Sequence, residues 1–333
     1  MKILRWLGIS LLVPIILIAF VWAYGALHFD GPSKLLAVAQ AVAVLTVFVF
    51  VKRWPRKLAV FGVWFAIVLT WWLSLKPSNA GDWQPDVAHK PEAEINGDVV
   101  TIRNVRNFDY RTATDFTQRW ETRTVRLSQL THIDIFVNYW GSPWMAHPIL
   151  SFQFADAPPL CFSIETRKRA GQSYSAIGGL YRQYDLIYIA AAERDIIRVR
   201  TNIRGEDAYL YRLTATPAEV RERFLEYLHF LNRLRDHPEW YNAIDNNCTT
   251  AIRHQHPAAE RTRWDWRMLV NGKGDELMYE RHTIVTDGLP FAELKRRALI
   301  DTAAKAAGDS ADFSTLIRAG RPGMGMPENA VGK

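Results

Sequence analysis

A cysteine that follows two asparagines is the residue best placed for nucleophilic chemistry. The run Asn246-Asn247-Cys248-Thr249-Thr250 contains a favoured helix start, because asparagine is common at the N-cap position. Cys248 would then lie in the first helical turn, where unpaired backbone N–H groups and the positive end of the helix dipole favour a thiolate. The alternative is that Cys248 is a small buried residue at a helix start with no chemical role.

A cysteine nucleophile needs a base, and a predicted β-hairpin offers His147. Strand alternation in the two predicted strands puts His147 and Glu165 on the same face of the hairpin. Two registers are open, which are the pairings Gln153–Pro159 and Phe154–Leu160. The first places His147 opposite Glu165, and the second makes them diagonal neighbours. A carboxylate that fixes the imidazole of a base beside a thiol is the logic of a catalytic triad. A hairpin with a merely solvated polar face is the alternative.

Other candidates carry weaker signals. Cys161 shares the face of Glu165 but lies in mid-strand, which favours a structural role, and His254 and His256 have no identifiable further metal ligands. Two cysteines exclude a disulfide framework and a Cys-rich zinc site, although a single Cys161–Cys248 disulfide stays open. We expect no cofactor and no metal. A basic cluster either grips an anionic headgroup or forms an exposed strand of alternating charge; it comprises Glu193-Arg194-Asp195, Arg198, Arg200 and Arg204.

The elements that must position these residues follow from hydrophobic periodicity. Short alternating runs predict strands, and they are Val99–Val105, Thr122–Leu127, Ile133–Tyr139, Ile149–Phe154, Leu160–Thr166, Leu186–Ala190 and Ile196–Thr201. An apolar stripe at helical period predicts a helix over Pro217–Arg235. A second helix begins at Asn246 or Asn247, and a third is expected over Phe291–Ala307.

Three apolar runs open the chain and predict membrane spans. They are Leu7–Leu27, Leu35–Val51 and Leu58–Leu75, each close to the roughly 17–25 residues that cross a bilayer. A cleaved signal peptide is the alternative for the first run. Basic residues before the first run and between the second and third place the N-terminus in the cytoplasm. Everything after Lys76 is then expected on the outer side, which is the periplasm in a Gram-negative cell.

The positive charge of the chain belongs to this membrane region. The formal net charge is +7, yet residues 1–76 hold eight basic residues and one acid, which leaves 33 of each sign in the remainder. A neutral outer domain argues against nucleic acid as a partner. We expect four segments, which are the three transmembrane helices at 1–76, a linker at 77–98, a catalytic domain at 99–320 and a tail at 321–333.

Three segments together resemble the Lnb N-terminal periplasmic domain family of bacterial membrane proteins. They are Ala146-His147-Pro148-Ile149-Leu150-Ser151-Phe152, Ser163-Ile164-Glu165-Thr166-Arg167, and Trp240-Tyr241-Asn242 followed by Asn246-Asn247-Cys248-Thr249-Thr250. The resemblance spans roughly Asp82 to Ile317. It implies an α+β fold like a circularly permuted papain-like domain, in which the His strand precedes the Cys helix. It implies Cys248 as nucleophile and His147 as base, and we add Glu165 as the orienting third residue. Supporting or substrate-binding candidates are Asn247, Ser151, Ser163, Arg167 and Arg194.

The family takes its name from a lipoprotein N-acyltransferase, so the resemblance implies a thiol-dependent acyltransferase. The expected substrates are a membrane lipid and a bacterial lipoprotein, at the outer face of the inner membrane. The chain has three spans before the domain and none after it, and family members differ in their membrane parts, so the named activity need not transfer. A cysteine amidase or peptidase of the cell envelope and a non-catalytic membrane-bound binding or scaffold module are the alternatives. The sequence does not fix the oligomeric state.

Overall fold

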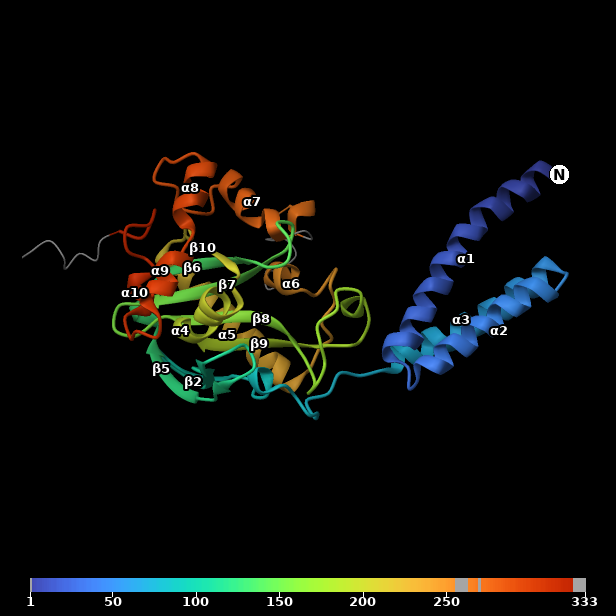
Figure 1. Cartoon of the computed structure of the whole chain (residues 1–333), viewed down its shortest axis with the longest axis horizontal. Helices are drawn as coiled ribbons and strands as arrows, with labels where there is room; N and C mark the ends of the chain where they lie inside the picture. Colours follow the sequence, from blue (N-terminus) through green and yellow to red (C-terminus); the bar gives the residue numbers. More distant parts are fainter. Residues whose placement is uncertain (1, 255–262, 269–270, 326–333) are drawn as a thin grey trace, which may run out of the picture. The chain divides into compact units, whose positions relative to one another are not determined.

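The computed structural model describes residues 2–254, 263–268 and 271–325, apart from the side chains of residues 2–11 and 254. Figure 1 shows the chain coloured along its sequence. Contacts divide it into two units. One unit comprises Met1–Ser78, Ser173–Asp185 and Trp240–Ala243, and the other comprises Asn79–Gln172, Leu186–Glu239 and Ile244–Lys333.

The three apolar runs of the first unit are helical, as expected. They form α1 (Lys2–Asp30), α2 (Lys34–Phe50) and α3 (Trp54–Ser74). Within the described residues, two stretches are long and apolar enough to cross a membrane, and they are Leu12–Asp30 and Trp54–Ser74. The 17 residues of α2 fall short of that length. Two candidate spans are therefore found, and the third crossing remains a proposal.

A later segment of the chain, Ser173–Asp185, packs against the ends of α1 and α3 within this unit. Tyr181 stacks on Phe29 with ring centroids 5.0 Å apart. The Asp30 carboxylate accepts hydrogen bonds from Trp72 Nε1 and from Gln183 Nε2, each at 2.7 Å. Gly25 makes this approach possible, since a Cβ atom there would lie 1.9 Å from the Tyr181 hydroxyl oxygen.

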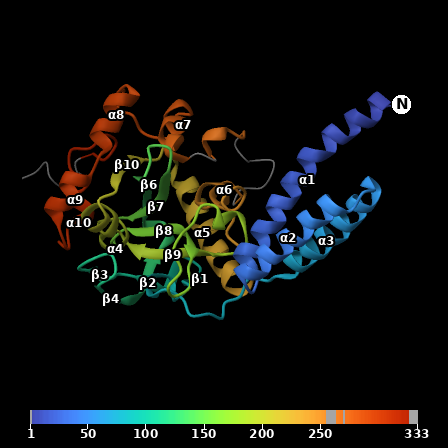
Figure 2. The same cartoon turned by 45° about the vertical axis from the view of Figure 1, so that its right-hand side comes forward.

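The second unit is built on an eight-stranded sheet (Figures 1 and 2). Its strands are β1 (Glu92–Asn96), β2 (Val99–Arg106), β5 (Trp120–Arg126), β6 (Leu130–Tyr139), β7 (Ala146–Phe154), β8 (Leu160–Arg167), β9 (Asp185–Ala192) and β10 (Asp207–Arg212). Their order is β1-β2-β9-β8-β7-β6-β10, with β5 also paired to β2. The short strands β3 (Asp109–Tyr110) and β4 (Phe116–Thr117) form a separate hairpin. The β2–β9 pair is parallel and the other pairs whose register is resolved are antiparallel.

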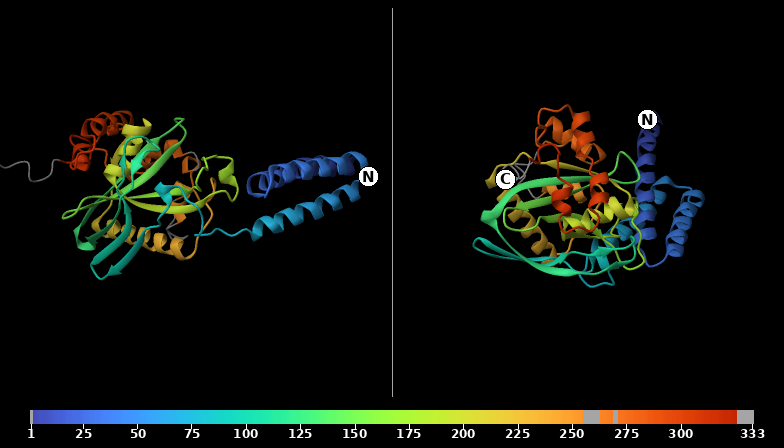
Figure 3. Two further views of the ribbon diagram at one scale, coloured as in Figure 1. Left: turned by 60° about the horizontal axis from the view of Figure 1, so that its bottom comes forward. Right: turned by 60° about the vertical axis from the view of Figure 1, so that its left-hand side comes forward.

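Helices cover both faces of this sheet, as the two views of Figure 3 show. The long helix α5 (Pro217–Asp236) begins with a capping box between Thr216 and Glu219. Its Phe224 packs against Phe152 and Phe162, at centroid distances of 5.0 and 5.9 Å. The opposite face buries Phe136, Ile149 and Cys161 beneath apolar residues from α4 (Glu193–Ile196), α9 (Asp301–Ala307) and α10 (Phe313–Leu316). The sheet is thus buried on both sides, which makes it a rigid support for side chains at its edge.

The β7–β8 hairpin adopts the first of the two registers left open by the sequence. Ser151 pairs with Cys161 and Ile149 pairs with Ser163. Continuing this register places His147 opposite Glu165. The other register, which pairs Phe154 with Leu160, does not occur.

Three sequence expectations are wrong in detail. The predicted strand Ile196–Thr201 is helical, because it falls in α4 and in the π-helical turn Val199–Arg204. The predicted linker 77–98 contains the 3-10 turn Pro85–Val87 and the strand β1. The predicted helix Phe291–Ala307 is divided into α8 (Phe291–Ala298) and α9, because the chain at Leu299 stays extended and bridges to Tyr209 of β10.

The remaining described elements are short helices and turns. They are α6 (Cys248–His254), α7 (Gly274–Glu280) and the 3-10 turns Leu127–Gln129, Gly178–Leu180, Trp266–Met268 and Asn271–Lys273. The last of these turns lies against the loop before β7, where Gly272 N–H donates to the Trp144 carbonyl at 3.0 Å. A Cβ atom on Gly272 would approach the Trp144 carbonyl carbon to 2.3 Å, so this contact requires glycine.

Candidate active site

Cys248 is the first residue of α6, and the asparagine before it caps that helix. Asn247 Oδ1 accepts hydrogen bonds from the backbone N–H groups of Thr249 and Thr250, both at 2.9 Å. In return, Thr250 Oγ1 accepts from Asn247 N–H at 2.9 Å. The expectation that a helix starts here is confirmed, with Asn247 rather than Asn246 as the cap. This position directs the free N–H end of the helix to the region of the Cys248 thiol.

His147 and Glu165 meet at the end of the β7–β8 hairpin. The distance from His147 Nε2 to Glu165 Oε1 is 3.1 Å, and the distance from the same nitrogen to Ser163 Oγ is 2.7 Å. Ser163 Oγ donates to Glu165 Oε1 at 2.7 Å. Both interactions engage Nε2, which leaves Nδ1 as the ring nitrogen available to Cys248. The Cys248 side chain is near enough to the His147 ring to help raise its pKa.

A buried arginine completes the charge balance of this cluster. Arg200 donates to Glu165 Oε1 at 2.9 Å and to Glu206 Oε2 at 3.0 Å. Burial by itself disfavours the imidazolium, but the negative charge of Glu165 outweighs it and raises the pKa of His147 to about 9. Burial likewise opposes ionisation of Glu165, yet His147 and Arg200 hold the pKa of that carboxyl well below its usual range. At neutral pH the pair is therefore an imidazolium and a carboxylate.

Asn271 is a site residue that the sequence did not reveal. Its Oδ1 accepts from Ala146 N–H at 2.9 Å, which orients the amide so that Nδ2 lies 3.5 Å from Cys248 Sγ. An amide donor fixed beside a nucleophilic thiol can stabilise negative charge on a reacting carbonyl oxygen. No sequence pattern indicates it, because Asn271 comes 23 residues after Cys248 and reaches the site through a turn whose path only the fold determines.

A mostly apolar cavity of about 380 Å³ lies beside the thiol. Thr249 and Asn271, which both contact Cys248, are part of its wall. The rest of the wall comes largely from β6, β7, α6 and α7, and includes Ile135, Val137, Leu150, Ile252 and Leu277. The volume falls within the range usual for small-molecule sites. The arrangement places the Cys248 sulfur next to a space suited to an apolar group.

Three of the predicted supporting residues lie elsewhere. Ser151, although on the His147 face, is fully buried and donates to Glu193. Arg167 donates to the carbonyls of Val87 and Ala88 at 3.0 and 2.7 Å, so it anchors the chain before β1. Arg194 pairs with Asp109 at 2.6 Å. The three residues were proposed from their positions in the sequence. Sequence position does not determine which group a side chain contacts in the folded chain.

Cys161 lies within the sheet and takes no part in this site. Cys161 and Cys248 are both free thiols, so no disulfide joins them. Cys161 is fully buried, and burial raises the pKa of its thiol well above the usual range. His256 and the side chain of His254 lie outside the described residues. Among the residues that are described, no three of the types His, Cys, Asp and Glu gather closely enough to hold a metal ion.

Comparison with known proteins finds a similarity in the part of the chain that contains His147, Glu165 and Cys248. Residues 116–272 match the sequence model of the Lnb N-terminal periplasmic domain family. This part of the chain is therefore similar to the Lnb N-terminal periplasmic domain. The match confirms the resemblance drawn from the sequence, and it includes His147, Glu165, Cys248 and Asn271. No curated protein and no solved structure gives a significant match to the chain.

The Lnb domain ends within the elements that form the site. Its last matched residue, Gly272, is the glycine packed against Trp144, so the match includes Asn271. Together with the two apolar N-terminal helices, the family fits a membrane protein that carries a periplasmic domain.

Proposed function

We propose that this chain is a membrane-anchored, thiol-dependent acyltransferase that acts on lipid or lipoprotein substrates. The observation that carries the proposal is the Cys248 thiol at the start of α6, beside a His147 ring that Glu165 and Ser163 orient. The apolar cavity at Thr249 and Asn271 supports an acyl chain as the group that is bound. The residue order, histidine strand before cysteine helix, agrees with a permuted papain-like arrangement.

The first half-reaction forms a thioester. Cys248 thiolate attacks the carbonyl carbon of a lipid ester, and the oxyanion accepts hydrogen bonds from Cys248 N–H and Asn271 Nδ2. When the tetrahedral intermediate collapses, the ester C–O bond breaks. The His147 imidazolium then gives its proton to the leaving alkoxide, so an alcohol departs and the ring becomes neutral.

The second half-reaction regenerates the thiol site. An amine, such as the α-amine of a lipoprotein, attacks the thioester while neutral His147 accepts its proton. The C–S bond breaks, which yields an amide and restores the thiolate–imidazolium pair. Glu165 and Arg200 stay charged throughout and hold the ring in position, as the orienting members of a triad do.

The N-terminal helices would hold the site at the membrane that supplies the lipid. In this proposal all three helices cross the inner membrane, with the N-terminus in the cytoplasm and the catalytic domain in the periplasm. The basic residues around Lys52–Lys57, between α2 and α3, support that orientation.

Mass spectrometry of the intact, membrane-extracted chain tests the mechanism. Wild-type protein incubated with phospholipid should carry one acyl mass that hydroxylamine removes, because hydroxylamine cleaves thioesters. Cys248→Ala should lack the adduct and lose roughly a thousandfold or more of turnover. Cys161→Ala is the matched control and should keep the adduct.

The alternatives give different results in the same experiment. Release of free acid or amine into water without an acceptor would identify a cysteine amidase or hydrolase. Complete absence of an adduct, with turnover unchanged in Cys248→Ala, would contradict the proposal and favour a non-catalytic binding module.

A further inference from the structure

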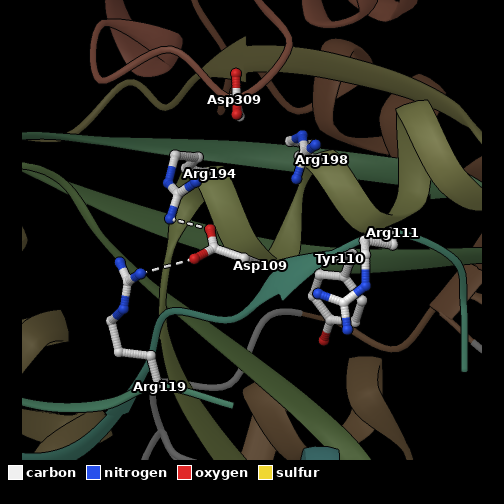
Figure 4. Close-up of a pocket in the computed structure, with 7 residues that line it drawn as sticks. All are labelled: Asp109, Tyr110, Arg111, Arg119, Arg194, Arg198 and Asp309. Atoms are coloured by element: carbon white, nitrogen blue, oxygen red, sulfur yellow. Dashed lines mark hydrogen bonds and ion pairs between the residues drawn. The ribbon is translucent and has the colours of Figure 1, made fainter. Parts of the chain in front are cut away.

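A second cavity, of about 450 Å³, lies away from Cys248 and is lined mainly by arginines. Figure 4 shows it between the β3–β4 hairpin and the helical segment Glu193–Arg204. It shares no lining residue with the apolar cavity beside the thiol. Part of its wall, including Asp109 and Arg111, lies outside the residues that match the Lnb family.

Most of the charges around this cavity are already paired. Asp109 bridges two arginines, because its carboxylate lies 2.6 Å from Arg194 and 2.7 Å from Arg119 (Figure 4). Arg111 is held by Asp115, with its Nε 2.8 Å from the Asp115 carboxylate. These fixed pairs keep three guanidinium groups at the wall in defined orientations. Asp309, at the rim, is exposed to solvent.

Arg198 is the lining cation that no carboxylate neutralises. Among the described residues it makes no ion pair, and its Nε is buried from solvent without a hydrogen-bond partner. A buried guanidinium N–H without an acceptor is costly, which is why such groups in native proteins usually have a partner. Arg198 and Arg194 are four residues apart on one helical segment, so both extend from the same face toward the cavity. The missing acceptor belongs in the cavity.

The chemistry of this wall selects one kind of anion. Guanidinium groups match the oxygens of phosphate in geometry and bind them with paired N–H donors. We propose that this cavity binds a phosphate ester, with Arg198 and Arg194 as its principal ligands.

The source of the phosphate is either a lipid headgroup or a soluble phosphate ester, and calorimetry on the full chain distinguishes them. The chain is placed in bilayer nanodiscs of phosphatidylcholine and titrated with glycerol 3-phosphate at constant ionic strength. In a second arm, thermal unfolding is compared between nanodiscs of phosphatidylcholine alone and nanodiscs that contain phosphatidylglycerol. Saturable binding of glycerol 3-phosphate identifies a soluble ester. If instead the melting temperature rises only in the nanodiscs that contain phosphatidylglycerol, the ligand is a lipid headgroup.

Variants of the lining arginines test whether glycerol 3-phosphate binding, or the lipid-dependent shift of the melting temperature, arises at this cavity. Arg198→Gln should weaken binding at least tenfold, or abolish the lipid-dependent shift. Arg103→Gln removes the same charge from an exposed ion pair with Glu94 and should change neither. Arg119→Gln, at a half-exposed position of the cavity wall, provides a second variant if Arg198→Gln does not fold. Unchanged phosphate binding in both cavity variants, or no effect in either arm with wild type, would overturn the proposal.

Discussion

The charge of the His147 ring depends on one neighbour, Glu165. The ring is nearly buried, and burial alone would keep it neutral at physiological pH. The carboxylate 3.1 Å away reverses that preference, and Arg200 on the far side of Glu165 keeps the carboxylate ionised. A resting imidazolium suits the proposed mechanism, in which the ring gives its proton to a leaving group.

The pH dependence of stability should reveal this pair. His147 has a pKa of about 9, above its ordinary value of 6.5, so its contribution is complete below pH 6.5 and is lost as the pH rises through 9. Glu165 has a lowered pKa, so its contribution is present above its ordinary value of 4.5 and is lost as the pH falls through the native value. Glu165→Gln should therefore lower the free energy of unfolding by about 3 kcal/mol near pH 6. The deficit should shrink above pH 9. Denaturant unfolding followed by tryptophan fluorescence at several pH values measures this.

Glu94→Gln provides the control for that series. Glu94 is half exposed and pairs with Arg103 at the surface, so its loss should change the free energy of unfolding by less than about 1 kcal/mol at any of these pH values. A deficit for Glu165→Gln that stays constant from pH 6 to pH 10 would show that His147 is not its charged partner.

At the scale of elements, the start of α6 determines where the thiol points. Asn247 satisfies two backbone N–H groups of a helix whose first residue is Cys248. Loss of the cap frees these donors and lets the first turn unwind, which moves the sulfur relative to His147 and Asn271. Small displacements of a reacting atom have large effects on rate.

Asn247→Ala should therefore affect activity more than stability. Loss of an N-cap costs about 1 kcal/mol, visible as a lower melting temperature. Turnover should fall by roughly 100-fold, because the thiol is no longer held in place. Asn247→Asp preserves the cap and should restore the melting temperature, while its negative charge beside the thiolate keeps turnover low. If Asn247→Ala retained full turnover, the cap would have no part in positioning Cys248.

Local pattern predicts some of these elements and fails for others. Alternation in β7 and β8 was enough to place His147 and Glu165 on one face, because one face of each strand is strongly apolar. The segment after β9 contains Ile196, Ile197, Val199 and Thr201, whose branched side chains favour strands. It is helical nonetheless, since its apolar residues pack against the sheet through tertiary contacts that outweigh the local propensity.

Across the whole domain, a buried ion network ties the C-terminal segment to the sheet. Arg318 donates to Asp134 of β6 at 2.9 Å and to Glu193 Oε2 at 2.7 Å. Both carboxylates are inaccessible to solvent. The three charges come from segments far apart in the sequence, so the network forms only when the C-terminal helices have docked.

Arg318→Met should destabilise the domain strongly. It leaves two buried carboxylates with fewer partners, and breaking such a network costs roughly 3–5 kcal/mol. A denaturant titration at pH 7 measures the loss. Arg297→Met, which removes a half-exposed partner of Glu293, should stay within about 1 kcal/mol of wild type. Equal stability of the two variants would show that the network does not hold the C-terminal segment.

Contacts between residues that are far apart in the sequence also explain which parts of the site the sequence could not predict. Cys248 and His147, the proposed nucleophile and base, could be picked out because each has a local signal, a capped helix start and a polar strand face. Arg200 and Asn271 have none. Arg200 was grouped with surface charges because its neighbours are charged, yet it is buried against Glu165. Asn271 reaches Cys248 only because Gly272 lets its turn pack against Trp144.

Because the two cysteines lie in different surroundings, their alkylation rates can measure how often the sheet of the native chain opens. Cys248 lies at the border of a cavity, whereas Cys161 is fully enclosed in the centre of the sheet with an un-ionised thiol. An alkylating reagent should therefore modify one equivalent of sulfur quickly and the second only when β8 separates from its neighbours. The slow rate, divided by the rate for a free thiol, gives the equilibrium constant for opening of the sheet. Site occupancy and local stability can then be followed in one time course, with no label introduced.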